Sequence, residues 1–312
     1  MKVDESLSNV AIIILNYNSP HLTINVVNHL LKFNTNLKVV VVDNNSNDNS
    51  KELFELYLKN RTSVFLVYND VNLGYAHGNN CGIIYSQKVL GVDIVGIMNP
   101  DVVVNVDVIK NLSDILVKDD GLGLVTAETY YNGEYHIPNE CAWEMPSLGQ
   151  LMFFCTIFGY LYKNSFARLG FAFNPQSYYS PEYYEGKKLA YVDVVQGCFF
   201  MARIDFLMAI NMLDSNTFLY YEENILAAKV RDIGKKNGVL TQNYIKHNHH
   251  IKDQKLLKKQ NKIFDLACLH NSRDYFIDKY SNFNKFKKIL LRNFLELDFK
   301  FRKMGINLIY KD

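Results

Sequence analysis

Residues 10–20 read Val-Ala-Ile-Ile-Ile-Leu-Asn-Tyr-Asn-Ser-Pro, and this stretch decides the class of fold. Its first six residues are apolar without a break, which is typical of a strand that is covered on both faces of a sheet. Polar residues follow at the end of the strand, and Ser19-Pro20 places a proline at the first position of a helix. A buried strand that leads directly into a helix predicts a parallel α/β sheet.

The same unit repeats along the first 130 residues. Further apolar runs predict strands at residues 37–42, 64–68, 94–98 and 122–126. A polar loop at 43–50 precedes one helix, and periodic apolar residues predict two more at 76–90 and 108–117. The alternation predicts a mostly parallel, mixed sheet flanked by helices on both faces.

The rhythm changes after residue 130. Residues 131–189 are rich in Tyr, Phe, Asn and Pro, and we expect a long excursion over the sheet that lines a binding cleft. A strand at 191–201 and a helix at 222–233 that stops at Gly234 follow. The chain then becomes helical and basic, so we expect one α/β domain over residues 1–250 and a C-terminal helical extension over 251–312.

Composition excludes several classes of protein. A chain of 312 residues can bury one large core with a smaller appendage, and its net charge of +2 does not suit a dedicated nucleic-acid binder. The five cysteines are scattered singly, which favours neither structural zinc nor a disulfide framework and fits the cytoplasm. The N-terminal residues do not have the pattern of a signal peptide, and no apolar stretch has the length of a membrane span.

Polar residues stand at the ends of four predicted strands. The four segments are Asn16-Tyr17-Asn18, Asp43-Asn44-Asn45, Asn72-Leu73-Gly74 and Asn99-Pro100-Asp101. At a single position such residues would simply make a turn or a helix cap. Because the carboxyl ends of parallel strands share one edge, four such segments favour a polar ligand site there.

The glycine-rich loops that bind phosphate in many α/β proteins are absent. No G-x-G-x-x-G follows the first strand, which argues against a dinucleotide dehydrogenase, and no G-x-x-x-x-G-K-[ST] occurs. A diphosphate would therefore need a cation to meet its charge, and a divalent ion held by a carboxylate is suitable. Asp101, directly after a buried strand, is placed to hold it.

Several ordered blocks resemble the inverting family 2 glycosyltransferases of the GT-A fold, and they look most like the rhamnosyltransferase-like branch. The resemblance spans roughly residues 9–250. Its blocks are residues 14–18, 42–46, 72–75, 99–101, 197–200, 218–223 and 231–234. It implies a nucleotide-sugar-binding half at 1–130 and an acceptor-side half at 131–250.

The resemblance also implies roles for the donor side. Asp43 would contact the nucleotide base beside the Asn16-Tyr17 backbone, whereas Asn72, Gly74 and Asn79 would lie against the ribose and the sugar. Asn99-Pro100-Asp101 takes the place of the family's Asp-x-Asp motif, so Asp101 would bind Mg²⁺ or Mn²⁺, with Asn99 as a weaker, neutral substitute. Gly197 would leave room for substrate.

Histidines and glutamates complete the implied site. A histidine of the His247, His249 and His250 cluster would help to hold the metal or the diphosphate; the alternative is a solvated polar turn. Glu222-Glu223 replaces the family's Glu-Asp, which implies that Glu223 is the general base. Glu222 shares a helix face with Leu226 and Ile233 and is expected to lean toward the protein. The alternative is that both are first-turn acids favoured by the helix dipole, and Asp214 is the next choice of base.

The resemblance implies transfer of a single sugar with inversion, from dTDP-rhamnose or, second, a UDP-hexose. The acceptor would be a glycan or lipid-linked oligosaccharide in the synthesis of cell-surface polysaccharide. Two rivals remain. A nucleotidyltransferase would need a basic, glycine-rich loop, and residues 16–20 contain no Lys, Arg or Gly. A non-catalytic nucleotide- or glycan-binding domain stays open because of Asn99 and Glu223.

Two further patterns bear on partners. Trp143 and Tyr178, Tyr179, Tyr183 and Tyr184 could stack on sugar rings, although packing is the commoner role for such residues. Residues 285–303 form a basic amphipathic helix that suits peripheral contact with the inner face of an anionic membrane. Packing of this helix on the protein's own core or on a partner subunit is the alternative.

Overall fold

The computed structural model describes residues 7–33, 36–131, 134–135, 140–153, 156–161, 178–248 and 259–310. Its first part consists of alternating strands and helices. They are β1 (Val10–Asn16), α1 (Pro20–Leu31), β2 (Lys38–Asp43), α2 (Ser50–Tyr57), β3 (Val64–Tyr68), α3 (Tyr75–Lys88) and β4 (Ile94–Met98). These strands pair in parallel in the order β3-β2-β1-β4, as the apolar runs predict.

The second part makes the sheet mixed. Its elements are β5 (Val102–Val104), α4 (Val106–Lys118), β6 (Leu122–Tyr131), β9 (Leu189–Val192), β11 (Phe199–Arg203), α8 (Ile204–Ala209), α9 (Glu222–Asp232) and β12 (Lys236–His247). The sheet continues from β4 in the order β11-β6-β12-β5, with β9 also paired to β12. β11 is antiparallel to both of its neighbours, and β12 is parallel to β6 but antiparallel to β5.

Two predictions about this part need correction. The segment 191–201, expected as one strand, is divided among β9, β10 (Val194–Val195) and β11. β5 was not expected, because a three-residue strand leaves no periodic signal in the sequence. Its pairing with β12, which runs from Val102↔His247 to Val104↔Ile245, brings together residues that are far apart in the chain.

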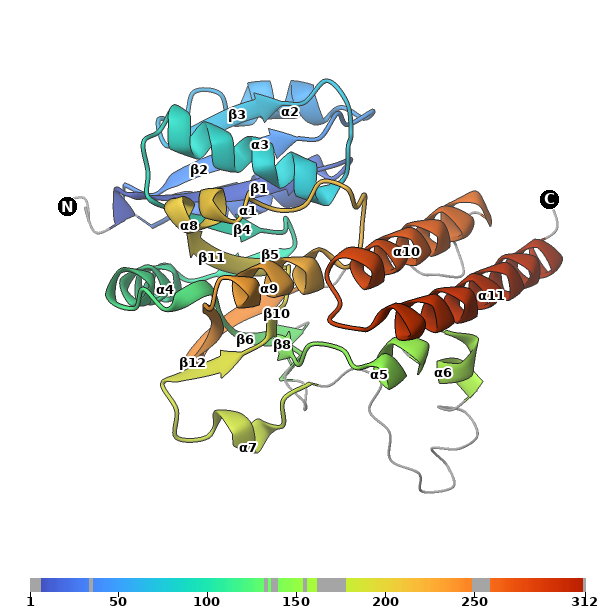
Figure 1. Ribbon diagram of the computed structural model, residues 1–312. Helices are drawn as coiled ribbons and strands as arrows, with labels where there is room; N and C mark the ends of the chain where they lie inside the picture. The colour runs from blue at the N-terminus through green and yellow to red at the C-terminus, as the bar shows by residue number, and fades with distance from the viewer. Residues whose placement is uncertain are drawn as a thin grey trace.

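Helices cover both faces of the sheet (Figure 1). α1, α2 and α4 bury apolar residues in one core, and α3, α8 and α9 do so in a second core on the other face. α3 packs closely on β1, since a side chain at Gly78 or Gly82 would meet Leu15 or Ile13 at 2.5 Å. This contact fixes the start of α3 at the carboxyl edge of the sheet.

The excursion after β6 carries short elements in its described residues. They are β7 (Glu134–Tyr135), β8 (Ala142–Trp143), α5 (Leu148–Phe153), α6 (Ile157–Leu161) and α7 (Pro181–Tyr184). β8 pairs with β10, and the isolated bridge between Trp143 and Tyr178 extends this small ladder.

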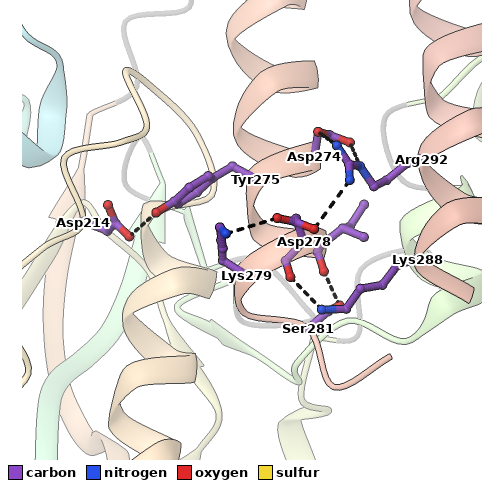
Figure 2. A network of polar contacts seen from close by, with 9 residues as sticks. Asp214, Asp274, Tyr275, Asp278, Lys279, Ser281, Lys288 and Arg292 are labelled. Carbon is purple, nitrogen blue, oxygen red and sulfur yellow. Dashed lines mark hydrogen bonds and ion pairs between the residues drawn. The ribbon is translucent and has the colours of Figure 1, made fainter. Parts of the chain in front are cut away.

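The chain ends in a helical hairpin of α10 (Lys259–Lys279) and α11 (Lys285–Ile309), which lie side by side in Figure 1. A third core joins the hairpin to α5 and α9 through residues that include Leu151, Tyr221, Phe276 and Leu295. Figure 2 shows the polar contacts between the two helices, where Arg292 binds Asp274 through nitrogen–oxygen distances of 2.6 and 2.8 Å. None of the helices in the described ranges has the length and apolarity that a bilayer crossing requires.

Candidate active site

A cavity of about 540 Å³ opens at the carboxyl edge of the sheet. Its wall comes from four parts of the chain: the strand ends, the loop before β11, the loop before α9, and the excursion. The lining residues include Asn99, Gln196, Gly197, Tyr220, Glu222, Glu223, His247, Trp143 and Leu151. Leu269 of α10 also lines it, so the C-terminal hairpin contributes to the wall.

Asp101 and His247 meet beside this cavity. β5 holds Asp101 at its start, and the pairing of Val102 with His247 places the two side chains together, with 3.3 Å between Asp101 Oδ1 and His247 Nε2. The Asp101 carbonyl also accepts a hydrogen bond of 2.9 Å from the Asn248 amide. His247 lines the large cavity, whereas Asp101 lines a separate, smaller hollow of about 260 Å³.

This pair fits a divalent cation in part. A carboxylate oxygen and an imidazole nitrogen 3.3 Å apart are near enough to bind one ion, and both are ordinary ligands of Mn²⁺. The described residues contain no group of three or more His, Cys, Asp or Glu side chains that could hold a metal ion. Such a site suits an ion that takes its other ligands from substrate phosphates and water. His249 lies outside the described residues.

Glu222 and Glu223 start α9 and both line the cavity. Glu222 is 8% exposed, and its Oε1 has no hydrogen-bond partner among the described residues. By side-chain exposure Glu223 is intermediate, whereas Glu222 is buried. The expected role of Gly197 changes, because a side chain there would stand 2.6 Å from Glu223 Oε1. The room that glycine leaves is filled by the carboxylate of Glu223.

The electrostatics of the two glutamates favour their neutral forms. Burial raises the pKa of Glu222, and the charge of Glu223 raises it further. Burial also raises the pKa of Glu223, although hydrogen bonds from its own backbone and from Gly197 oppose the shift. Two carboxyl groups this close cannot easily ionise together. The pair therefore holds a proton more readily than ordinary glutamates do.

The loop that presents these glutamates has an unusual backbone. Tyr220 and Tyr221 have φ angles of 74° and 66°, and such angles are costly for residues with large side chains. α10 holds this loop: Ser272 Oγ donates a hydrogen bond of 2.8 Å to the Leu219 carbonyl, and the rings of Tyr221 and Phe276 lie 5.4 Å apart. The hairpin thus supports the conformation that points the glutamates into the cavity.

Asp214 is tied to the same hairpin rather than to the cavity. Tyr275 donates a hydrogen bond of 2.9 Å to Asp214, as Figure 2 shows, and Tyr280 donates another. Burial alone would raise the pKa of Asp214, but hydrogen bonds from Tyr280, Asn216 and Tyr275 outweigh it and lower the pKa. A carboxylate held in this way is a poor general base.

Three predicted donor-side residues lie in a hydrogen-bonded network, which we call the amide cluster. It consists of Asn16, Asp43 and Asn72 together with Asn44, Ser46 and Ser50. Asn16 has no exposed surface, and its Nδ2 donates to Asp43 Oδ1 over 2.8 Å. Asp43 also accepts from the hydroxyl and the amide of Ser46, over 2.6 and 3.1 Å. The Asn16 side chain is therefore not available for direct contact with a donor in this structure.

Asn72 and Gly74 hold the turn before α3. Asn72 Oδ1 accepts hydrogen bonds of 2.9 Å from both Asn44 Nδ2 and the Gly74 amide. Gly74 has a φ of 95°, and a side chain there would lie 2.3 Å from the Phe218 carbonyl oxygen, so only glycine fits. Asn79 is fully buried, and its Nδ2 binds the Tyr75 carbonyl over 3.0 Å. Asn79 therefore has no exposed surface that a ribose could contact. Tyr17, by contrast, is 47% exposed.

The structure thus unites some predicted residues and separates others. Asn99, Gly197, Glu222, Glu223 and His247 line one cavity, whereas Asn16, Tyr17, Asp43, Asn72 and Asn79 do not. Tyr75 also lines the cavity, although no role was expected for it. Tyr75, within the quoted block at 72–75, donates a hydrogen bond of 2.8 Å to the Gly197 carbonyl. Trp143 lines the cavity, while Tyr179 and Tyr183 stack on each other with centroids 4.6 Å apart.

Comparisons with known proteins agree with this fold. Residues 11–165 match the sequence model of the family "Glycosyl transferase family 2". A search of curated proteins found no sequence relative. Among solved structures, the chain is similar to the mannosyltransferase PcManGT from Pyrobaculum calidifontis in complex with GDP-Man and Mn²⁺, with a TM-score of 0.56 and 14% identity over 96% of this chain and 73% of that one.

Two other solved structures are similar. GalNAc-T7 with UDP, GalNAc and Mn²⁺ has a TM-score of 0.60 and 14% identity, and the match covers 98% of this chain but 58% of that one. Residues 1–349 of S. aureus TarS have a TM-score of 0.52 and 13% identity, covering 94% and 72% of the two chains. Identities this low carry the fold alone. Residues 11–165 therefore match the glycosyl transferase family 2 model, and the structure has the GT-A fold.

Proposed function

We propose that the chain is an inverting glycosyltransferase that moves one sugar from a nucleotide sugar to a hydroxyl of a glycan or lipid-linked acceptor. One observation carries the proposal. A single cavity of about 540 Å³ is lined by Asn99 and His247, from the expected metal and donor site, and by the Glu222 and Glu223 pair. A volume of this size suits a ligand of the dimensions of a sugar and its leaving group. The family 2 match supports glycosyl transfer as the chemistry.

Glu223 is the proposed general base. In an inverting transfer, the acceptor oxygen attacks the anomeric carbon from the face opposite the diphosphate. A new carbon–oxygen bond forms, the bond to the diphosphate breaks, and its electron pair leaves with the nucleoside diphosphate. The hydroxyl proton passes to the Glu223 carboxylate, whose raised pKa suits proton abstraction near neutral pH.

Glu222 has a supporting part in this proposal. It lies deeper than Glu223, and its Oε1 lacks a hydrogen-bond partner among the described residues. The charge of Glu223 opposes ionisation of Glu222, so Glu222 stays protonated beside the Glu223 carboxylate. Tyr75, whose pKa burial and the two glutamates raise, stays protonated and holds the Gly197 carbonyl beside the pair.

Asp101 and His247 are the proposed residues for Mg²⁺ or Mn²⁺. The Mn²⁺ in the PcManGT and GalNAc-T7 structures supports a metal in this fold. When bound, such an ion neutralises the negative charge that builds on the diphosphate. The Asp101 carboxylate and the His247 imidazole lie 3.3 Å apart because the pairing of β5 with β12 brings them together.

The donor side is proposed in a revised form. Asn99 lines the cavity and is proposed to contact the donor directly, whereas Gly197 is proposed to leave space for the Glu223 carboxylate. Tyr17 is exposed at the end of β1 and stays a proposed contact for the nucleotide, as does the 5% exposed carboxylate of Asp43. The Asn16, Asn72 and Asn79 side chains are proposed to shape the loops from inside, since their hydrogen bonds are internal.

For the sugar we propose dTDP-rhamnose first and UDP-hexoses second, in the synthesis of cell-surface polysaccharide. The support is the resemblance of blocks 14–18, 42–46 and 99–101 to the rhamnosyltransferase-like branch. Saturation-transfer NMR with both donors tests the choice. Binding of UDP-galactose without binding of dTDP-rhamnose would reverse it.

A donor panel tests the function itself. The full chain is incubated with nucleotide sugars and Mn²⁺ or Mg²⁺, and release of nucleoside diphosphate is followed with and without EDTA. We expect metal-dependent release from one donor or a small group of donors. In a second arm with nucleoside triphosphates and sugar 1-phosphates, release of pyrophosphate would indicate nucleotidyl transfer instead. Binding of every donor tested without any release would indicate a non-catalytic domain.

A further inference from the structure

An exposed apolar stripe runs along α11. Phe286, Leu290, Leu297, Phe301, Met304 and Leu308 recur at helical spacing, and each is between 48% and 74% exposed. The opposite face of the same helix is buried through Leu291, Leu295 and Asp298. A helix that is apolar on its outer face as well as its inner one has a second surface to cover.

A second element adds to this stripe. In α6, Phe158, Tyr160 and Leu161 are 45%, 68% and 49% exposed. α6 is fastened to α11, because the Ile157 amide donates a hydrogen bond of 2.7 Å to Asp298 Oδ1 and the rings of Phe158 and Phe294 lie 4.9 Å apart. The stripe of α11 and these three residues of α6 form one feature, which we call the outer face.

The charges around the outer face are mainly positive. α11 contains seven basic and two acidic residues. Lys285, Lys287 and Lys303 are exposed, and no carboxylate forms an ion pair with them in the ranges that the structure describes. Apolar residues flanked by such lysines are the pattern of a helix that lies in the plane of an anionic membrane surface.

We propose that the outer face docks on the surface of a bilayer that contains anionic lipids. Its apolar side chains would enter the boundary between headgroups and acyl chains, and the lysines would meet lipid phosphates. A second copy of the chain fits less well, because two outer faces in contact would bring their unpaired lysines together. The aromatic rings of Phe158, Tyr160 and Phe301 suit the interfacial region of a bilayer.

The outer face is joined to the cavity wall. α11 packs on α5 in the third core, and Gln150 and Leu151 of α5 line the cavity, as does Leu269 of α10. Docking would therefore hold the cavity at the membrane, where a lipid-linked acceptor resides. This last step rests on the proposed function, whereas the docking itself does not.

Vesicle flotation tests the docking with the full chain. Removing α11 is unsuitable, because Leu291 and Leu295 belong to the third core. The test variant is Leu297→Gln/Phe301→Gln, on residues that are 56% and 57% exposed. The matched control is Leu56→Gln/Val117→Gln, on residues of α2 and α4 that are 70% and 67% exposed. A third variant, Lys285→Glu/Lys287→Glu/Lys303→Glu, reverses the charge.

We expect wild type and control to float with phosphatidylcholine vesicles that contain phosphatidylglycerol. The Leu297→Gln/Phe301→Gln variant should partition onto the vesicles at least about tenfold less, because it lacks two apolar side chains that would enter the bilayer. The charge variant should lose a similar factor at low salt. Failure of the wild type to float, or equal flotation of all four proteins, would overturn the proposal.

Light scattering without vesicles distinguishes self-association of the outer face from membrane docking. A dimer that Leu297→Gln/Phe301→Gln dissociates would assign the outer face to self-association and would also overturn membrane docking. Donor turnover of this variant in solution should be unchanged. The test of glycosyl transfer and the test of membrane docking are therefore independent, because either proposal can fail while the other succeeds.

Discussion

Two groups of polar side chains lie at the carboxyl edge of this sheet, and they differ in how their hydrogen bonds are arranged. In the amide cluster, Asn16 and Asp43 are buried, and Asn16 donates a hydrogen bond of 2.8 Å to Asp43. The Ser46 hydroxyl donates a further hydrogen bond to the Asp43 carboxylate. In the carboxylate pair, Glu222 is buried with an oxygen that has no partner among the described residues, and both pKa values are raised.

The difference separates a structural role from a chemical one. Buried polar groups are normally satisfied, so a closed network stabilises the loops that it joins. A buried carboxyl group with one oxygen that lacks a hydrogen-bond partner costs stability, and it survives where substrate or chemistry needs it. Both groups follow strands or begin helices in the same way, and their residue types alone do not tell them apart.

The largest effect on activity is expected from Asp101→Ala. Removal of the carboxylate that pairs with His247 should lower turnover by about 10³-fold or more, since charge on the leaving group would go unmet. The fold should survive, because Asp101 lies at a partly exposed strand end. Steady-state kinetics and thermal melting measure both, with exposed Asp114→Ala as the control. EDTA-sensitive turnover near the wild-type rate would remove Asp101 from the site.

Glu223→Gln should lower turnover by about 10²-fold or more, because it removes basicity while keeping shape. Donor binding, measured by calorimetry, should not change. If Glu223→Gln is active and Glu222→Gln is inactive, the roles are reversed. If both are active, the base lies outside the carboxylate pair, and Asp214 would be a weak substitute because Tyr275, Tyr280 and Asn216 already bind it.

Asn16→Ala should act on stability rather than on chemistry. It leaves Asp43 and Thr23 with unmet hydrogen bonds in a buried place, so we expect a loss of about 2–4 kcal/mol in the free energy of unfolding. Urea denaturation measures the loss, and exposed Asn28→Ala is the control. Turnover per folded molecule should stay within a few-fold of wild type. A loss of turnover as large as that expected for Glu223→Gln, at unchanged stability, would contradict the distinction between the amide cluster and the carboxylate pair.

Much of the architecture follows from the sequence pattern. The apolar runs of β1 to β4 are continuous because both sheet faces are covered, and that signal is strong over five to seven residues. Gly234 follows the end of α9 and has a φ of 75°, as is expected of a glycine that terminates a helix.

The rest depends on contacts between distant segments. β5 is too short to detect and becomes a strand only by pairing with β12, and the neighbourhood of Asp101 and His247 arises from that pairing. The inward turn of Asn16 depends on Ser46 and Ser50 of another loop. Large residues at positive φ, Tyr220 and Tyr221, are held by α10 from far along the chain, and no local signal marks them.

The smallest change is expected from Glu222→Gln, which should stabilise the protein. The folded state raises the pKa of Glu222 from its usual 4.5, so the protonated form is favoured and ionisation opposes folding as pH rises above 4.5. The stabilisation should be absent at low pH and reach roughly 1–3 kcal/mol at alkaline pH. Unfolding curves across this range measure it. A loss of stability at high pH would mean that the Glu222 charge has a partner.

The central claim is that the carboxylate pair is the reaction centre, in which Glu223 ionises and its charge keeps Glu222 protonated. The pH dependence of kcat/KM for the wild type and Glu222→Gln tests it most directly. We predict that wild-type activity falls on the acid side above pH 4.5, the usual glutamate value, and that this acid limb stays in place in Glu222→Gln, because the amide replaces a carboxyl group that is already neutral when Glu223 ionises. Loss or displacement of the acid limb in Glu222→Gln would contradict the claim.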